Sequence, residues 1–199
     1  MKTRDDAWAL LTEWTKGDSL LKHCLAVETA MRAYARHYGE DEELWGLTGL
    51  LHDFDYERHQ TPDKHPAVGA EVLRAQGYPE ELIYAILTHA EYLNLERKSR
   101  LDLTLFAVDE LAGFITAVTL VRPSKSLHDV EVSSVKKKMK DKPFARAINR
   151  DDIINGAASL QLSLDEHIGV VLAAMQDQAA ALGLAGGTSP VNLANRAPK

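Results

Sequence analysis

Five ionisable side chains interrupt the apolar faces of this 199-residue sequence where packing alone would place none. They are His23, His52, Asp53, His89 and Asp109. Burying an ionisable group without a partner costs several kcal/mol, so each one needs a reason to be there. Alone, a histidine beside an apolar face is most often a hydrogen-bonded core residue, and Asp109 could pair with a core arginine or lysine. Taken together, imidazoles and carboxylates form the ligand set of divalent transition metals, and the sequence therefore predicts a metal site.

The pair His52-Asp53 lies in the stretch GLLHDFDYERH, residues 49 to 59. Two metal ions held close together need a bridging carboxylate or water, and a carboxylate next to a ligating histidine is well placed to bridge. Asp53 is that residue. Thiolates are not required, and Cys24, the single cysteine, is predicted to be a buried helix residue that forms no intramolecular disulfide.

Helices must position these side chains, because apolar residues recur at helical spacing nearly throughout and strict alternation is rare. We therefore expect an all-α fold, a compact single-domain helical bundle with the metal site in its core. Gly46 and Gly49 would let another helix approach closely. The expected helices run from about residue 4 to 15, from 19 to Gly39, from Asp41 to near His52-Asp53, from Pro66 to Gly77, from Pro79 to His89, from Asp102 to about 120, from 129 to 140, and from Ser163 to Gly183.

These elements suggest one domain over residues 1–184, with a core at about 19–120 that carries the motif and a helical extension at about 129–183. The last segment, 185–199, is rich in small, Gly, Pro and polar residues, and we expect it to be disordered. The net charge is -6, which argues against a protein that coats nucleic acid. The basic run Lys136 to Lys140 is interpreted as a solvated helix face.

The sequence also suggests where the protein works. No apolar stretch of about 18 residues runs without interruption, so no membrane span is expected. The N-terminus lacks the pattern of a signal peptide, and a single cysteine gives no sign of an oxidising compartment, so we expect a cytoplasmic location.

The order of the ionisable residues resembles that of a known family. His23, then His52-Asp53, then Asp109, on successive predicted helices, is similar to the H...HD...D signature of the HD-domain superfamily of metal-dependent phosphohydrolases. The resemblance covers about residues 19 to 120. It implies an all-helical HD-type fold in which these four residues ligate a metal.

Two further histidines extend the resemblance. His65 in HPAVGA and His89 in ILTHAEY resemble the additional pair of the dinuclear branch, H...HD...H...H...D. The resemblance implies that Asp53 bridges to a second ion, which His65 and His89 also hold. The stretch after the pair departs from the common lettering, because it reads HDFDYERH rather than HDIG and contains no GYP element. The expected cofactor is one or two divalent transition metal ions, chosen from Mn, Fe, Ni, Co and Zn.

A phosphoester substrate would also need positively charged groups, because negative charge builds up on its oxygens during hydrolysis. The candidates near predicted ligands are a catalytic Arg58 and the substrate-binding Lys22, Lys64, Arg122 and Lys125. Each could instead be an ordinary surface cation. Asp55 is a catalytic candidate as a general acid, with two alternatives, an outer partner of a ligating histidine or a solvent-facing loop acid. Tyr56 and Tyr92 could line a substrate pocket.

The function predicted from these residues is metal-dependent hydrolysis of a small phosphoester, either a nucleotide or a phosphorylated metabolite, by a metal-activated water. Both a phosphomonoester and a phosphodiester fit this prediction. Two alternatives stay open. One is a di-iron oxygenase of the HD-like type, and the other is a non-catalytic ligand-binding module on the same fold. The expected partner is a small molecule rather than nucleic acid.

Overall fold

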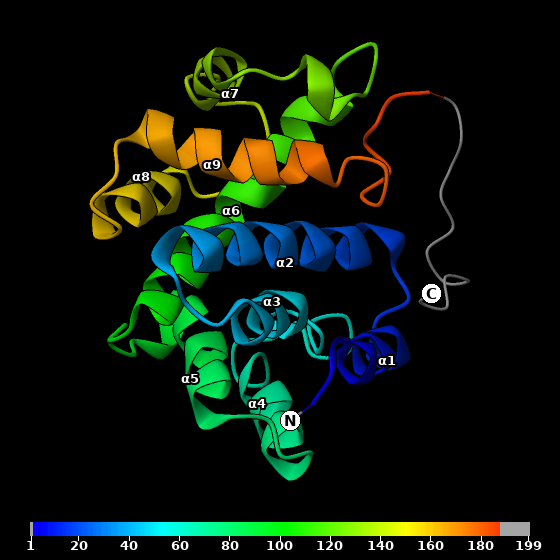
Figure 1. Cartoon of the computed structure of the whole chain (residues 1–199), viewed down its shortest axis with the longest axis vertical. Helices are drawn as coiled ribbons and strands as arrows, with labels where there is room; N and C mark the ends of the chain where they lie inside the picture. The colour runs from blue at the N-terminus through cyan, green and yellow to red at the C-terminus, as the bar shows by residue number, and fades with distance from the viewer. Residues whose placement is uncertain (1, 188–199) are drawn as a thin grey trace.

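The computed structural model describes residues 2–187 and shows an all-α protein, as predicted (Figure 1). No strand occurs among these residues; there is only an isolated bridge between Ser126 and Ala185. The α-helices are α1 (Arg4–Trp14), α2 (Asp18–Tyr38), α3 (Glu42–Leu51), α4 (Ala67–Ala75), α5 (Glu80–His89), α6 (Arg100–Leu120), α7 (Val132–Met139), α8 (Arg150–Ser159) and α9 (Leu164–Asp177), with short 3-10 turns η1 (Glu91–Leu93) and η2 (Leu127–Asp129).

Side-chain caps explain where several helices begin. Thr3 and Ser163 each accept a hydrogen bond from the third residue of the following helix, whose acid bonds back to the cap. The same capping box shows that the predicted start of α6 was wrong. Ser99 is the N-cap, and Asp102 is the third helical residue rather than the cap. A serine three positions before an acid is the signal that marks this start.

The C-terminal segment differs from the prediction in two places. α8 was not predicted as a separate helix, because Asn155 and Gly156 within it are poor helix formers. α9 ends at Asp177, short of the predicted stop at Gly183, and turns follow it. Of the tail expected to be disordered, Ala185 lies in the bridge to Ser126, and residues 188–199 lie outside the described part.

The helix α6 crosses behind α2 and α9, which lie side by side in Figure 1. It contacts α2, α5, α8 and α9. By length and composition alone α6 could cross a membrane, although Asp109 and Glu110 interrupt its apolar residues, and 61% of its most apolar window is buried within the protein. These contacts account for its apolar composition, because a helix surrounded by neighbours is apolar on most sides.

Two helices that carry site residues, α2 and α3, approach each other closely. A Cβ added at Gly49 would lie 2.9 Å from the backbone N and Cα of Glu28. The prediction that a glycine in this helix allows a close approach is therefore confirmed. This contact brings the end of α3 toward the first half of α2.

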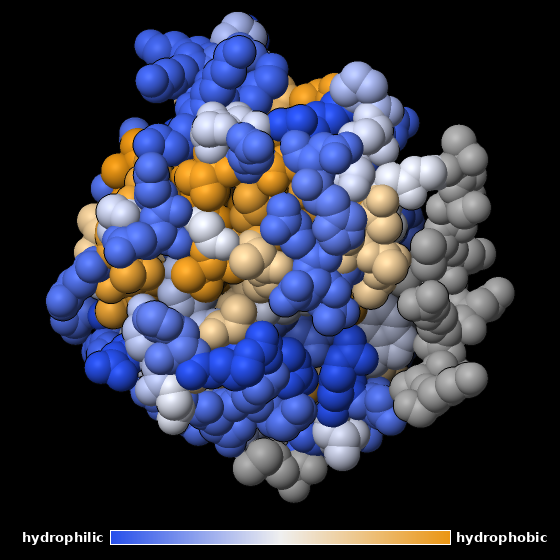
Figure 2. Space-filling model, turned by 45° about the horizontal axis from the view of Figure 1, so that its top comes forward, coloured by the Kyte–Doolittle hydropathy of each residue, from blue (hydrophilic) through white to orange (hydrophobic). Residues whose placement is uncertain are grey.

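Most of the face shown in Figure 2 is hydrophilic, and apolar residues gather in its middle. The amphipathic helices turn their apolar sides inward, where residues such as Leu11, Tyr34 and Phe114 are fully buried. Cys24 is also fully buried, as predicted.

Candidate metal centre

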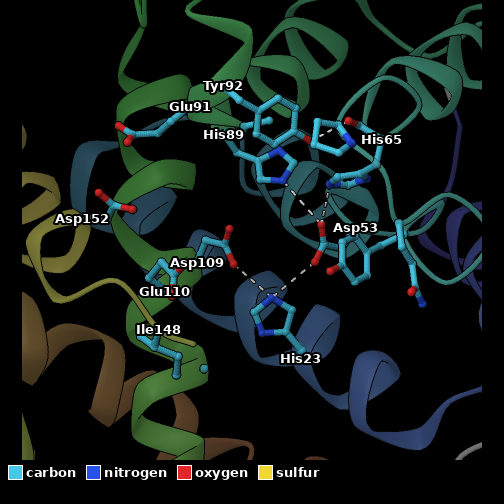
Figure 3. A pocket seen from close by; sticks show the side chains of 15 residues that line it. His23, Asp53, His65, His89, Glu91, Tyr92, Asp109, Glu110, Ile148 and Asp152 are labelled. Carbon is cyan, nitrogen blue, oxygen red and sulfur yellow. Dashed lines mark hydrogen bonds and ion pairs between the residues drawn. The ribbon is translucent and has the colours of Figure 1, made fainter. Parts of the chain in front are cut away.

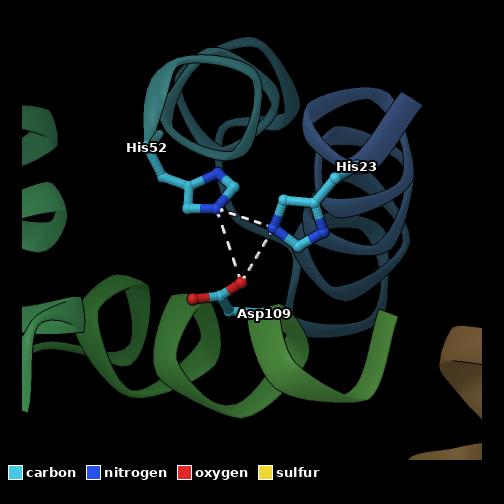
Figure 4. A group of neighbouring side chains, drawn as sticks. All are labelled: His23, His52 and Asp109. Carbon is cyan, nitrogen blue, oxygen red and sulfur yellow. Dashed lines mark hydrogen bonds and ion pairs between the residues drawn. The ribbon is translucent and has the colours of Figure 1, made fainter. Parts of the chain in front are cut away.

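Three side chains from three segments converge beside the middle of α6 (Figure 4). His23 comes from the second turn of α2, His52 is the C-cap of α3, and Asp109 comes from α6. The Nε2 atom of His23 lies 3.1 Å from Nε2 of His52 and 3.0 Å from Oδ1 of Asp109. Nε2 of His52 lies 3.4 Å from the same oxygen. Three ligand atoms this close can coordinate one metal ion.

A second group of three lies next to the first (Figure 3). Asp53 follows directly after His52, His65 precedes α4, and His89 ends α5. Oδ1 of Asp53 lies 3.2 Å from Nε2 of His65 and 3.4 Å from Nε2 of His89. These atoms also form a group that can hold a metal. The side chains of His65 and His89 are only 6% and 8% exposed.

Asp53 faces both groups with different oxygens. Its Oδ1 atom points to His65 and His89, whereas Oδ2 lies 3.6 Å from Nε2 of His52 and 3.9 Å from Nε2 of His23. One carboxylate therefore stands between the two sets of imidazoles.

The outer nitrogen of three of these histidines is held by a fixed acceptor. Nδ1 of His52 lies 2.8 Å from the carbonyl oxygen of Gly49, and Nδ1 of His89 bonds the carbonyl of Ile86. Nδ1 of His65 lies 2.8 Å from Oδ1 of Asp55. Carbonyl and carboxylate oxygens accept, so Nδ1 donates, and in the neutral imidazole the lone pair of Nε2 faces the site. Inward lone pairs beside carboxylates form a donor set that suits a divalent metal ion.

The charges of the groups reinforce this fit. Burial lowers the pKa of His65, but hydrogen bonds to Asp53 and Asp55 outweigh it and raise the pKa to about 9. Burial opposes ionisation of Asp53 and Asp109, yet the positive charge on His52, with other imidazoles, keeps the pKa of both acids below the ordinary value. The cluster is thus a place where positive charge is stabilised.

A cavity of about 630 Å³ opens onto both groups. Tyr56 and Tyr92 line it, as the sequence suggested, and their side chains are partly exposed. It is also lined by three acids that the sequence analysis did not single out, namely Glu91, Glu110 and Asp152. Burial, with the charges of Asp109 and Asp152, raises the pKa of Glu110 to about 7.

Comparison with known proteins agrees with this geometry. The family model described as HD domain matches residues 20–113, which include all six candidate ligands. These residues form an HD domain. The helices α7, α8 and α9 lie beyond the matched segment. Together with the two clusters, the match supports the predicted metal-binding hydrolase.

Several curated proteins are similar in sequence to part of this chain. A ribonuclease Y of Desulfotalea psychrophila is 30% identical over 139 residues, which is 68% of this chain and 26% of that protein. A ribonuclease Y of Oleidesulfovibrio alaskensis is 30% identical over 96 residues, 48% of this chain and 18% of that protein. An uncharacterized protein of Methanocaldococcus jannaschii is 40% identical over 70 residues, 33% of this chain and 41% of that protein. The chain thus spans 18% to 41% of the length of these relatives. No solved structure matches it significantly.

Asp55 of the HD domain is 1% exposed, so it is not a solvent-facing loop acid. Its two oxygens accept hydrogen bonds from His65 Nδ1 at 2.8 Å and from the backbone N–H of Gly69 at 3.0 Å. Both oxygens face away from the cavity toward these donors, so the role of general acid is not supported. The structure places Asp55 as the outer partner of His65, the alternative considered from the sequence. Gly69 was missed, because the acid that its N–H bonds lies 14 residues earlier in the sequence.

The structure does not bring the five predicted phosphate-binding cations to the cavity, because none is among its lining residues in the described part of the chain. Arg58 donates to the carbonyl of Glu13 at 2.7 Å and lies over the ring of Trp14. Lys22 pairs with Asp18 at 2.6 Å, and Arg122 donates to Ser134 at 2.6 Å. Lys64 and Lys125 are exposed. Closeness in sequence to a ligand did not determine the direction of these side chains.

Proposed function

We propose that this chain is a metal-dependent phosphohydrolase with two divalent transition metal ions and a small phosphoester substrate. The observation that carries the proposal is Asp53, whose two oxygens face two separate groups of histidines. His23, His52 and Asp109 would hold one ion, and His65 and His89 the other, with Asp53 shared.

The protein residues prepare this site before any substrate enters. Gly49, Ile86 and Asp55 orient the imidazoles through their Nδ1 atoms, so that the Nε2 atoms need no rearrangement to bind. When bound, a divalent ion supplies a water that ionises near neutral pH, and the ion itself neutralises charge on the phosphoryl oxygens. The open cavity gives the phosphoester access to this point.

Metal analysis and activity together test the proposal. Protein purified without chelator is expected to contain two transition metal ions per chain and to release phosphate from p-nitrophenyl phosphate after addition of Mn, Fe, Ni, Co or Zn. Replacement Asp53→Asn should remove metal and activity, whereas the exposed His128→Ala should not. Full metal content and full activity in Asp53→Asn would contradict the proposal. If His65→Ala and His89→Ala both keep activity, the functional site has one ion.

The same assay separates the oxygenase alternative. A hydrolase releases phosphate without oxygen, whereas a di-iron oxygenase requires oxygen and iron. Phosphate release under anaerobic conditions with Mn therefore supports hydrolysis, and activity that appears only with iron and consumes oxygen would replace the proposal.

A phosphodiester bond in RNA is the second candidate substrate. The names of the relatives favour it, because two of them are called ribonuclease Y. The charge of the cavity opposes it, because acids rather than cations surround the two metal-binding groups among the described residues. Cleavage of a single-stranded oligoribonucleotide faster than p-nitrophenyl phosphate would favour RNA.

A further inference from the structure

The wall of the cavity beyond the metal-binding groups is acidic. Glu91 in η1, Glu110 in α6 and Asp152 in α8 lie along one side of it, and Asp53 lies across from them (Figure 3). Three segments far apart in sequence thus place carboxylates around one space. No lysine or arginine lines this cavity within residues 2–187.

A neighbouring cation, Arg97, does not compensate this charge fully. Arg97 lies 3.6 Å from Glu91 but is stacked over the ring of Phe106, with its guanidinium carbon 3.5 Å from the centroid. Burial and the charge of Glu91 still raise the pKa of Asp152, although Arg97 acts in the opposite sense. A single arginine, Arg97, therefore faces two carboxylates here, those of Glu91 and Asp152.

The space on the other side of the site also lacks a cation. The cavity continues into a second one of about 570 Å³, and His23, Tyr56, Gln60 and Gly113 line both. Among the described residues, no lysine or arginine lines the second cavity, and the acid that lines it is Glu57. Its carboxylate accepts hydrogen bonds from the backbone N–H groups of Lys16 and Gly17.

This distribution of charge decides what a substrate can carry besides the phosphate that reaches the metal site. A second phosphate would lie among carboxylates with no cation to receive it, which is unfavourable. A substrate ammonium would meet those carboxylates, and the exposed rings of Tyr56 and Tyr92 could take it on their faces.

We infer that the phosphoester bound here carries an ammonium group. Glu91, Glu110 and Asp152 select it over phosphoesters that carry no charge besides the reacting phosphate and over those that carry further phosphates. The inference rests on the proposed function. It adds the class of substrate, a phosphorylated amine, and three residues that determine specificity.

Matched substrates test it in the metal-loaded protein. Values of kcat/KM are measured for two phosphorylated amines, aminoethyl and aminobutyl phosphate, and for the corresponding alcohols, hydroxyethyl and hydroxybutyl phosphate, while p-nitrophenyl phosphate reports general activity. We expect at least one amine to exceed its alcohol about tenfold, equivalent to about 1.4 kcal/mol. The preference should shrink as salt rises, since salt screens charges at exposed sites.

Variants locate the selectivity. Asp152→Asn and, on a different segment, Glu91→Gln are each expected to lower the ratio of amine to alcohol several-fold. Asp151→Asn is the matched control, because Asp151 is the exposed neighbour in α8 and does not line the cavity; it should leave the ratio unchanged.

The outcomes distinguish the two proposals. Hydrolysis of p-nitrophenyl phosphate with no preference for either amine overturns the inference alone. The same holds if Asp151→Asn changes the ratio as much as Asp152→Asn and Glu91→Gln do. Failure to hydrolyse any phosphoester with any of the metals overturns the proposed function, and the inference with it.

Discussion

Replacing Gly69 with alanine should weaken metal binding although Gly69 is not itself a ligand. Gly69 lies in α4, and its N–H donates to Oδ2 of Asp55. An added Cβ would lie 2.8 Å from Cγ and 2.9 Å from Oδ2 of Asp55, and 3.0 Å from Cε1 of Phe54. Asp55 and Phe54 are 1% and 0% exposed, so neither can turn into solvent.

The size of the effect follows from these distances. Carbon atoms in good contact are about 3.5–4.0 Å apart, so Asp55 must move by roughly 0.7 Å or more. A displacement of that size away from Gly69 breaks or strains its 2.8 Å bond to Nδ1 of His65. Loss of an outer partner typically lowers metal affinity by about 10–100-fold. Crowding in the core costs about 1–3 kcal/mol, and the helix propensity of alanine returns about 1 kcal/mol.

Gly169→Ala is the matched control, because Gly169 lies within α9 and an added Cβ there meets nothing within 4 Å. This change should stabilise the protein by about 1 kcal/mol and leave metal affinity as it is. Titration calorimetry with Mn²⁺ or Zn²⁺ measures affinity, and urea unfolding measures stability.

The reasoning is refuted if Gly69→Ala binds metal as tightly as wild type and gains the same stability as Gly169→Ala. Asp55→Asn provides a second check. An amide keeps the shape, but its NH2 group cannot accept from either His65 Nδ1 or the N–H of Gly69, so one of the two hydrogen bonds is lost. Metal affinity should therefore fall without the steric overlap of Gly69→Ala.

Three further predictions concern the same fold. If free metal is present at a hundred times its Kd, removing it with a chelator should lower the free energy of unfolding by about 2.7 kcal/mol. For a chain of this size the Tm measured by calorimetry should then fall by about 5–11 °C. An unchanged Tm would argue against metal binding. Burial lowers the pKa of His167 in the folded state. The neutral imidazole therefore stabilises the fold above the unfolded pKa of about 6.5, and this stabilisation is lost as pH falls through the folded pKa. With chelator present, the unfolding free energy of His167→Gln should fall less between pH 7.5 and 5 than that of wild type, and a fall equal to that of wild type would contradict this prediction. Glu28 is 5% exposed and bonds Arg4 and Arg32, so Glu28→Ala should cost about 1.5–3 kcal/mol in urea unfolding, and a neutral result would show that solvent replaces the pairs.

The buried pair behind the His167 prediction has a defined proton arrangement. Nε2 of His167 lies 2.8 Å from the carbonyl oxygen of Ala107, which can only accept, so Nε2 donates. Nδ1 is then the acceptor for the hydroxyl of Tyr34, 2.6 Å away. Protonation of Nδ1 would oppose this arrangement. The helix predicted from Ser163 to Gly183 includes His167, but the sequence gives no sign of its burial, because both partners are distant in sequence.

Local signals predicted most of the helices and the metal-binding groups. Caps such as Thr3 and Ser163 act within one turn of the helix that they begin. The candidate ligands stand out because they are ionisable residues beside apolar helix faces, where packing alone would not place them. The role of Asp55 could not be assigned from local signals, because its burial depends on the approach of α4. The prediction that five cations act on the phosphoester failed for a related reason. The partners of a long side chain such as Arg58 are brought near only in the folded chain. For Arg58 they are the ring of Trp14 and the carbonyl of Glu13.

The six candidate ligands come from five separate segments, in α2, at the end of α3, before α4, at the end of α5 and in α6. A bound ion is therefore a reversible cross-link between parts of the chain that no disulfide joins. Such a link has no partners until α5 and α6 have docked on α2 and α3, so it should stabilise the native state much more than any partly folded one. Metal should then slow unfolding more than it speeds folding. In hydrogen exchange, the amides of all five segments should become protected together rather than one helix at a time.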